Sequence, residues 1–490
     1  MKNKISLITL IACAAAGTTF AADPVEAFRA SSGTTTNSAD AIYVGNPVWA
    51  SDAQQIGEKY VADLFLAYES PTFTWDSELN AFCQDETGYR DDDPTHHGGS
   101  YRQFNAVFAL TGTAQFTNAA DATLTFRCES ETAGHYSGYD PERKEYFNVE
   151  SDNLILFADS SKFTNEGTIS YESYFTGTAG GTYEDWNNGK PIGFSVLLRD
   201  DAVFENAGTI SAEPDNYIEW VNYNLFGNAK FVNTASGKIR GIDLLLSGDS
   251  VFENAGTIVN RGVSSTDDIY ILLRENAKLV NTGTIDSDKY NFSFEAGFSG
   301  TSKIENRGTM TGADVDFRIG NDPILGISAS FENYGTIKPE ENSSSAVAFG
   351  VNLRDLDKSG NDVDFWDLKD AYTETMHAGD LNVKNFGTID LAGTGTMSVS
   401  SGMKLTLAQG STIAGNLEVG KNLEFYLDNT FCTLHIDKDV LNIELTGQGG
   451  NAPLISGDLE LCNSIELDVS FAEDAVKKTK YELTLWGGEL

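Results

Sequence analysis

Apolar and polar residues alternate in short runs through most of the chain, and one run keeps returning. Residues 203–210 read VFENAGTI, with Phe204, Asn206 and Ile210 on the same parity. A period of two is typical of a β-strand with one buried face. Further copies end at Ile169, Ile258, Ile285, Met310, Ile337 and Ile389, a looser copy ends at Ile239, and a degenerate one surrounds Asn118. Such repetition predicts a solenoid in which each copy adds one turn.

The same alternation continues upstream of each copy. The residues ten, eight and six places before the leading apolar position are Phe194, Val196 and Leu198; Val221, Tyr223 and Leu225; Ile242, Leu244 and Leu246; Ile269, Ile271 and Leu273; and Phe294, Ala296 and Phe298. They share the parity of the repeated Asn, so we expect all of them to point into one core. Strands that cannot bury this face alone must stack turn on turn. The chain is therefore predicted to be all-β, a single-stranded right-handed parallel β-helix (β-solenoid) with N-terminal and C-terminal caps.

The polar residues of the repeat suit its corners. An Asn in a bend can bond to the same residue in the turns above and below, which predicts a buried ladder. The Gly two places later permits a tight or left-handed backbone. The ladder residues are Asn165, Asn206, Asn233, Asn254, Asn281, Asn306, Asn333 and Asn385. Acidic residues such as Asp200 and Glu275 occupy the preceding corner, where other copies have Gly227 or Gly248, which indicates turn chemistry.

The start of the chain is typical of a secretory signal. Lys2 and Lys4 precede an apolar run, and small residues lead to Ala21, so we predict a signal peptide over residues 1–21. A bacterial lipoprotein signal with Cys13 as the lipidated residue is the alternative. No other segment has the ~18 consecutive apolar residues of a membrane helix. The mature protein is therefore expected to be exported, on the outer surface or outside the cell, with the periplasm as a further option, and to have no transmembrane span.

The remaining chain divides by its repeats. Residues 22–105 lack them and are interpreted as an N-terminal cap region, because an open solenoid end exposes apolar side chains. Residues 106–395 are predicted to be the β-helix repeats, with insertions at 171–192 and 338–380. Residues 396–490 continue the alternation in shorter units, as terminal rungs and a C-terminal cap.

Charge excludes some partners. The chain has 33 basic and 72 acidic residues, a formal net charge of −39. Nucleic acid is not a natural partner, because phosphate contacts need a basic face. The same balance argues against an anionic bilayer. It favours a soluble, acidic surface whose strand edges are protected from pairing.

Cysteine and metal chemistry leave two hypotheses. The cysteines beyond the signal are Cys83, Cys128, Cys432 and Cys462, an even number that allows two disulfides in an exported chain. The pairing stays open, and buried free thiols are the alternative. Asp355, Asp357, Ser359 and Asp362 match the first half of a calcium loop. The match fails at Asp362, where a calcium loop needs an apolar residue, and at Trp366, where it needs Glu. No other cofactor is expected.

The insertions are the first candidates for a binding surface. They are rich in aromatic residues, among them Tyr174, Tyr183, Trp186 and Trp366. Aromatic loops on a rigid scaffold suit contact with a protein or glycan. The alternative is that these loops fold back over the lateral surface of the solenoid.

Catalytic motifs are absent from the sequence. The five histidines, His96, His97, His135, His377 and His435, are scattered, and no GxSxG, HExxH or phosphate-binding Gly loop occurs. We therefore expect a non-enzymatic binding or display protein. The alternative is a carbohydrate-active β-helix enzyme, a polysaccharide lyase or glycosidase, with carboxylates in a groove formed by the insertions.

The FxNxGTI phrase, repeated from 163 to 389 behind a signal peptide, resembles the β-helical passenger regions of autotransporter adhesins and related bacterial surface proteins. The resemblance covers roughly half of the chain and implies adhesion or surface display by a non-enzymatic protein. It concerns architecture more than activity, because a fold does not fix a function. Such proteins carry a C-terminal membrane barrel, and we expect none here because few residues follow the repeats.

Overall fold

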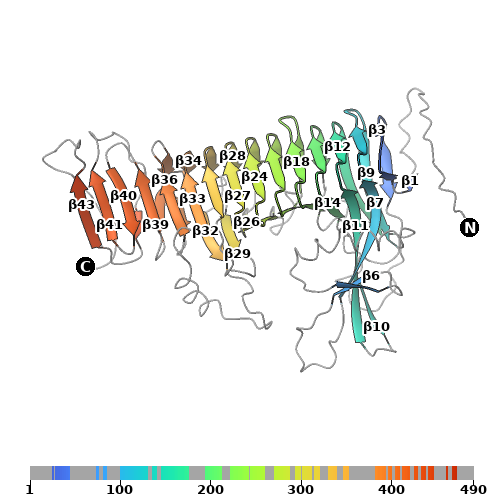
Figure 1. The fold of residues 1–490 in the computed structure, drawn as a ribbon, viewed down its shortest axis with the longest axis horizontal. Helices are drawn as coiled ribbons and strands as arrows, with labels where there is room; N and C mark the ends of the chain where they lie inside the picture. Colours follow the sequence, from blue (N-terminus) through green and yellow to red (C-terminus); the bar gives the residue numbers. More distant parts are fainter. Residues whose placement is uncertain are drawn as a thin grey trace, which may run out of the picture.

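The chain folds into a rod of stacked β-strands (Figure 1). The computed structural model describes residues 25–26, 28–44, 73–76, 81–84, 100–130, 135–140, 145–175, 194–211, 221–241, 243–259, 270–286, 293–298, 301–311, 314–319, 329–338, 346–352, 381–392, 395–399, 403–408, 411–419, 424–428, 432–437, 440–445, 459–461 and 466–471. All regular secondary structure in these residues is β-strand. The predicted all-β parallel β-helix is confirmed.

Three long sheets form the faces of the rod. In spatial order, sheet A contains β1 (Val25–Glu26), β4 (Ala41–Val44), β9 (Thr123–Ser130), β13 (Thr168–Phe175), β16 (Thr209–Ser211), β19 (Lys238–Arg240), β22 (Thr257–Val259), β25 (Thr284–Asp286), β28 (Thr309–Thr311), β31 (Thr336–Lys338), β34 (Thr388–Asp390) and β37 (Thr412–Ala414).

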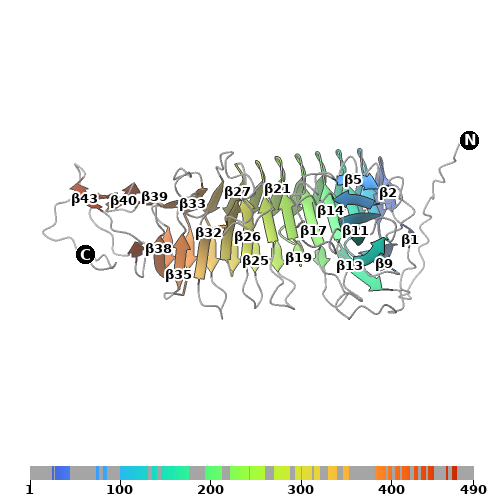
Figure 2. The ribbon, with the colours of Figure 1, turned by 90° about the horizontal axis from the view of Figure 1, so that it is seen from below.

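Sheet B contains β42 (Leu459–Leu461), β38 (Asn416–Val419), β35 (Thr396–Val399), β32 (Ala346–Asn352), β29 (Asp314–Ile319), β26 (Ser293–Phe298), β23 (Tyr270–Leu273), β20 (Asp243–Leu246), β17 (Val221–Leu225), β14 (Phe194–Leu198), β11 (Glu145–Phe157), β7 (Ser100–Leu110), β6 (Ala81–Gln84) and β5 (Phe73–Asp76). In addition, β10 (His135–Asp140) pairs with β11, and β2 (Phe28–Ala30) pairs with β7. Figure 2 shows this sheet along the underside of the rod.

Sheet C contains β3 (Thr34–Asn37), β8 (Gln115–Asn118), β12 (Lys162–Asn165), β15 (Val203–Asn206), β18 (Lys230–Asn233), β21 (Val251–Asn254), β24 (Lys278–Asn281), β27 (Lys303–Asn306), β30 (Ser330–Asn333), β33 (Leu381–Asn385), β36 (Met403–Leu407), β39 (Glu424–Asp428), β40 (Cys432–Asp437), β41 (Val440–Leu445) and β43 (Glu466–Phe471). Each turn of the rod passes through sheets B, C and A in that order. Equivalent strands pair in parallel and in register, as when Asn206 of β15 meets Asn233 of β18.

The core is a stack of identical positions from successive turns. Phe163, Phe204, Phe231 and Phe252 are fully buried, and the centroids of neighbouring rings lie 4.8, 4.7 and 4.9 Å apart. Each such side chain contributes about 1.5–3 kcal/mol before chain entropy is subtracted. The inward parity predicted from the sequence holds at the described positions of sheet B, including Val196.

Sheet B is also covered on its outer side near the N-terminal end of the rod. Leu154, Leu156 and Leu197 have the outward parity, yet each is at most 1% exposed. Simple alternation in the sequence does not reveal this second buried face, because a strand buried on both faces reads as a continuous apolar run.

The Asn ladder runs through the corner between sheets C and A. Each side-chain amide donates to the Oδ1 of the Asn in the next turn at 2.7–2.8 Å, from Asn118 through the eight predicted residues to Asn385. Asn37 extends the ladder by one turn, donating to Asn118 at 2.8 Å. These amides satisfy one another, so the ladder fixes the register of the turns from Asn37 to Asn385. In the next turn Leu407 takes the ladder position.

The motif glycines are required by close approach and not by a left-handed backbone. A Cβ on Gly208 would lie 1.9 Å from the backbone oxygen of Gly167 in the preceding turn. Most of the left-handed residues in the described chain lie instead at the corner before sheet C, where φ is 60° at Asp200, 57° at Glu275 and 73° at Gly248. The interpretation of this acidic corner as turn chemistry agrees with that geometry.

Three boundaries differ from those expected. The first turn is made by β2, β3 and β4 within the predicted cap region 22–105, so the rungs begin before residue 106. The predicted insertion 171–192 begins with residues of β13, which continues to Phe175. The predicted insertion 338–380 contains β32, which pairs with β29 and β35 as a regular strand of sheet B.

Both ends of the rod depart from the parallel pattern. The first parts of β7 and β11 extend beyond the core and pair antiparallel with β6 and β10, forming a side sheet that projects from the rod (Figure 1). At the other end β39, β40 and β41 form an antiparallel meander, and β43 pairs in parallel with β41.

Candidate functional site

Sheet C presents columns of outward-facing side chains along the rod. One column is formed by the residue that follows each ladder Asn, and in most turns it is small or polar, as at Ala207, Ala255 and Thr282. In three successive turns this position holds a large side chain: Arg307 between β27 and β28, Tyr334 between β30 and β31, and Phe386 between β33 and β34. We refer to these three residues as the aromatic column.

The aromatic column is stacked and exposed. The rings of Tyr334 and Phe386 are nearly parallel, with an interplanar angle of 5° and centroids 4.6 Å apart. The Cζ atom of Arg307 lies 4.5 Å from the centroid of the Tyr334 ring, on which the guanidinium stacks. Tyr334 is 38% exposed and Phe386 is 37% exposed, and these two are the exposed large hydrophobic side chains among the residues whose side chains the structure describes.

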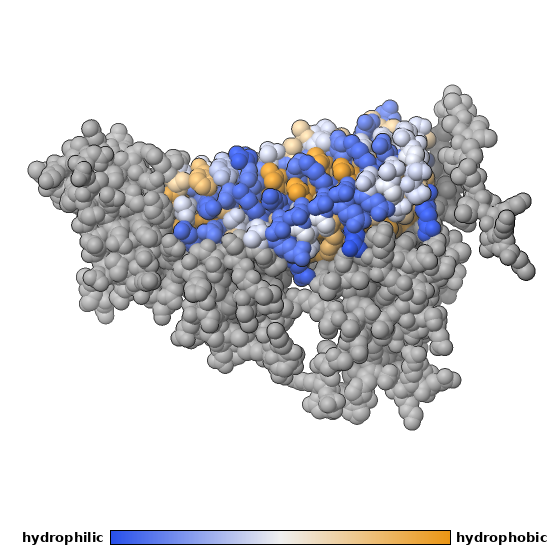
Figure 3. Space-filling view, viewed as in Figure 1, coloured by the Kyte–Doolittle hydropathy of each residue, from blue (hydrophilic) through white to orange (hydrophobic). Residues whose placement is uncertain are grey.

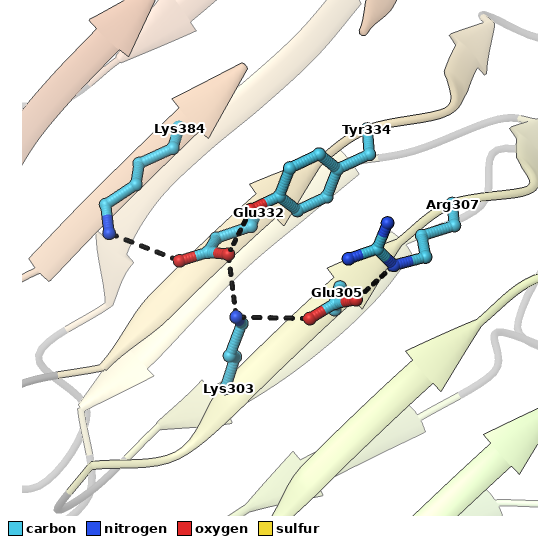
Figure 4. Close-up of polar contacts among 6 residues, drawn as sticks. All are labelled: Lys303, Glu305, Arg307, Glu332, Tyr334 and Lys384. Carbon is cyan, nitrogen blue, oxygen red and sulfur yellow. Dashed lines mark hydrogen bonds and ion pairs between the residues drawn. The ribbon is translucent and has the colours of Figure 1, made fainter. Parts of the chain in front are cut away.

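Four charged groups lie beside the column (Figure 4). The Lys303 ammonium bridges Glu332 at 2.7 Å and Glu305 at 3.1 Å, and Lys384 reaches Glu332 at 3.2 Å. The Tyr334 hydroxyl donates to Glu332 at 3.0 Å.

Arg307 closes the network. Its Nε donates to Glu305, so the stacked guanidinium is held in place by a carboxylate as well as by the Tyr334 ring. The aromatic column and the four charges form one connected cluster across three turns.

The network keeps both carboxylates ionised. Partial burial acts to raise the pKa of Glu332, but hydrogen bonds from Lys303, Lys384 and Tyr334 outweigh it, and the pKa lies below the usual carboxyl value. The same competition between burial and hydrogen bonds from Arg307 and Lys303 lowers the pKa of Glu305. Burial also opposes the charge of Lys303, yet its two carboxylate partners raise its pKa.

The rest of this face carries ordinary diagonal ion pairs. A Lys at the start of one strand reaches a Glu in the next turn, as from Lys162 to Glu205 at 3.0 Å and from Lys230 to Glu253 at 2.7 Å. Figure 3 shows hydrophilic residues interspersed with small hydrophobic groups along the described part of this view. Exposed pairs of this kind contribute about 0–1 kcal/mol each.

The site residues proposed from the sequence fall mostly outside the described part of the chain. Tyr183, Trp186, Trp366 and the calcium candidates Asp355, Asp357, Ser359 and Asp362 lie outside the described residues, as does Cys462. The structure describes the backbone of Tyr174 in β13, Cys83 in β6, Cys128 in β9 and Cys432 in β40, but not their side chains. Binding by the insertions, calcium and the disulfides stay predictions.

Within the described residues, no group of three or more His, Cys, Asp or Glu side chains could hold a metal ion. A helix long and apolar enough to cross a membrane is likewise not found in this part of the chain.

The aromatic column is the feature that sequence reasoning missed. Its residues stand in the variable position of the repeat, in IENRGTM, FENYGTI and VKNFGTI. The signal was that two consecutive copies have an aromatic residue where the others have a small or polar one. Comparison with models of known protein families, with curated proteins and with solved structures found no match.

Proposed function

We propose that this protein is an exported, non-enzymatic, adhesin-like β-helix of the bacterial surface that binds a partner through the aromatic column of sheet C. The observation that carries the proposal is the exposed stack of Arg307, Tyr334 and Phe386. The predicted signal peptide and the resemblance of the repeats to autotransporter passenger regions support export and surface display.

Residue types and rigidity both favour a binding role. Aromatic residues and Arg are enriched at protein interfaces and dominate the energetic hot spots. The column stands on strands whose register is fixed by Asn306, Asn333 and Asn385, so its side chains need little ordering when a partner binds. Surface aromatics have no comparable role in holding the core.

The electrostatics of the cluster suit recognition more than proton transfer. A general acid of a glycosidase needs a raised pKa, whereas the pKa values of Glu305 and Glu332 are both lowered. Fixed carboxylates next to aromatic faces can position a complementary partner without changing their protonation state.

A binding panel tests the proposal. The purified chain would be assayed against extracellular matrix proteins, intact host cells, and acidic and neutral polysaccharides, beside a Tyr334→Ala/Phe386→Ala variant. Thr164→Ala, an outward change on the same sheet, is the matched control. We expect at least one partner to be bound by the wild type and the control and lost by the double variant, with unchanged thermal midpoints.

Two results would contradict the proposal. One is equal binding by the wild type and the double variant to every member of the panel. The other is reproducible cleavage of a polysaccharide, with or without calcium, that a carboxylate substitution abolishes, because this would favour the enzyme hypothesis.

A further inference from the structure

The aromatic column stops abruptly at one end. In the next turn the strand register pairs Asn385 with Leu407, which places Ala408 directly after Phe386 in the column. The backbone confirms the position, because the Ala408 amide donates to the Asn385 oxygen at 2.9 Å. Tyr334 has Arg307 and Phe386 as ring neighbours, whereas the column position after Phe386 holds the small residue Ala408.

The gap beside Phe386 has the thickness of one flat group. Successive turns of a parallel sheet are about 4.8 Å apart, which is also the spacing at which aromatic rings and guanidinium groups stack. Among the residues whose side chains the structure describes, Tyr334 is the one aromatic residue in ring contact with Phe386, and the Phe386 side chain is 37% exposed. A planar group from outside the chain would therefore continue the existing stack.

The column itself indicates which group fits. Arg307 already stacks on Tyr334 with its Cζ atom 4.5 Å from the ring centroid, so a guanidinium on an aromatic face is an arrangement this surface holds. A guanidinium stacks through its planar face, which a Lys ammonium cannot do. The occupant should thus be an arginine side chain.

Charge favours the same occupant. The chain has a formal net charge of −39, which attracts basic partners over long range. The nearest described cation on this strand is Lys384, whose ammonium forms an ion pair with Glu332 at 3.2 Å (Figure 4). In the turn after Ala408 the register, which pairs Leu407 with Leu427, places Asp428 at the same column position.

We propose that the gap between Phe386 and Ala408 is a subsite for an arginine side chain of a basic protein partner, which stacks on Phe386 as Arg307 stacks on Tyr334. The inference rests on the proposed function and assigns the class of partner to the same surface. Long-range attraction then brings basic segments to the rod, and stacking selects arginine over lysine.

Two matched peptides test the subsite, one carrying several arginines and the other carrying lysines at the same positions. Binding to the full chain would be measured by calorimetry at physiological salt. We expect the arginine peptide to bind about two- to fivefold more tightly, the range of an exposed cation–π contact. Phe386→Leu, which keeps apolar bulk, and Ala408→Phe, which fills the gap with the chain's own ring, should abolish this preference. Ala408→Ser should keep it.

Equal binding of the two peptides to the wild type, or a preference that survives in Phe386→Leu and Ala408→Phe, would overturn the subsite. The proposed function is tested separately, by comparing the wild type with the Tyr334→Ala/Phe386→Ala variant in the binding panel. If that variant loses a partner while the peptides do not differ, the subsite is wrong and the binding surface stands. If the preference for the arginine peptide is lost in Phe386→Leu and Ala408→Phe and kept in Ala408→Ser, the subsite is supported whichever partner the panel identifies.

Discussion

The side-chain amide of Asn254 donates to the Oδ1 of Asn281 at 2.8 Å in the buried corner between sheets C and A. Its own oxygen accepts from Asn233 at 2.7 Å. Each turn along the ladder is therefore tied to its neighbours by a buried polar group, and loss of one member leaves two buried groups short of a partner.

Asn254→Ala is accordingly expected to lower the free energy of unfolding by about 1–3 kcal/mol. Glu253→Ala is the matched control, because Glu253 points outward and forms an exposed ion pair with Lys230. That change should cost a few tenths of a kcal/mol. Urea titrations of the two variants measure the difference, and equal midpoints would contradict the assigned register.

The two buried tyrosines of the core should behave as a unit. The hydroxyls of Tyr171 and Tyr223 lie 2.5 Å apart, and both side chains are at most 1% exposed. Tyr171→Phe leaves the Tyr223 hydroxyl unpaired and should cost about 1–3 kcal/mol, whereas Tyr171→Phe/Tyr223→Phe should return close to the wild type. Chemical unfolding of these two variants and of Tyr223→Phe completes the double-mutant cycle, and strictly additive losses would show that the pair is not coupled.

Serines at the corner before sheet C offer a stabilising change. The Ser250 hydroxyl is buried and has no hydrogen-bond partner, while the equivalent position in the next turn is Ala277. An unsatisfied buried hydroxyl costs about 1–3 kcal/mol. Ser250→Ala should therefore raise the thermal midpoint and Ala277→Ser should lower it. A fall in the midpoint of Ser250→Ala would mean that the hydroxyl has a stabilising contact.

Acid should weaken the charged cluster through Glu332. Its pKa in the folded chain lies below the ordinary value of 4.5. The contribution of Glu332 to the free energy of unfolding is therefore present above pH 4.5 and is lost as the pH falls through the folded pKa. The thermal midpoint of the wild type should therefore fall more steeply below about pH 4.5 than that of Glu332→Gln. Identical slopes for the two proteins in a calorimetric pH series would rule out this contribution.

The stabilisation provided by Lys303 depends on pH in the opposite direction and is lost at high pH. Its pKa in the folded chain is raised above 10.5, so its contribution is present below 10.5 and is lost as the pH rises through the folded pKa.

Much of the rod could be predicted from the sequence because each turn reuses the same residues. The parity of Phe204, Asn206 and Ile210 identifies the inner face, and the structure buries all three. The turn formed by residues 28–44 was missed, since Asn37 is preceded by Thr34-Thr35-Thr36 and has no following Gly-Thr-Ile. Its place follows from pairing with β8, which is a long-range contact.

The candidate site was harder to see, because it depends on side-chain conformation. The sequence places Tyr334 and Phe386 at the same outward position of successive repeats, which fixes their column. It does not specify that both rings adopt parallel rotamers, or that Arg307 stacks on one of them. Tyr171 was assigned to an insertion for a related reason, since its burial depends on the distant Tyr223.

The most direct test of the binding surface compares two variants in their affinity for the partner that the panel identifies. One is Tyr334→Ala/Phe386→Ala, and the other replaces residues 176–192, the part of the aromatic-rich insertion that follows β13, with a short Gly/Ser linker. We expect the first variant to lose at least about tenfold in affinity, as hot-spot residues do. Its thermal midpoint should stay near the wild type, and the linker variant should bind as the wild type does. Full affinity in Tyr334→Ala/Phe386→Ala, with loss of binding in the linker variant, would contradict the account and place the binding site in the insertion.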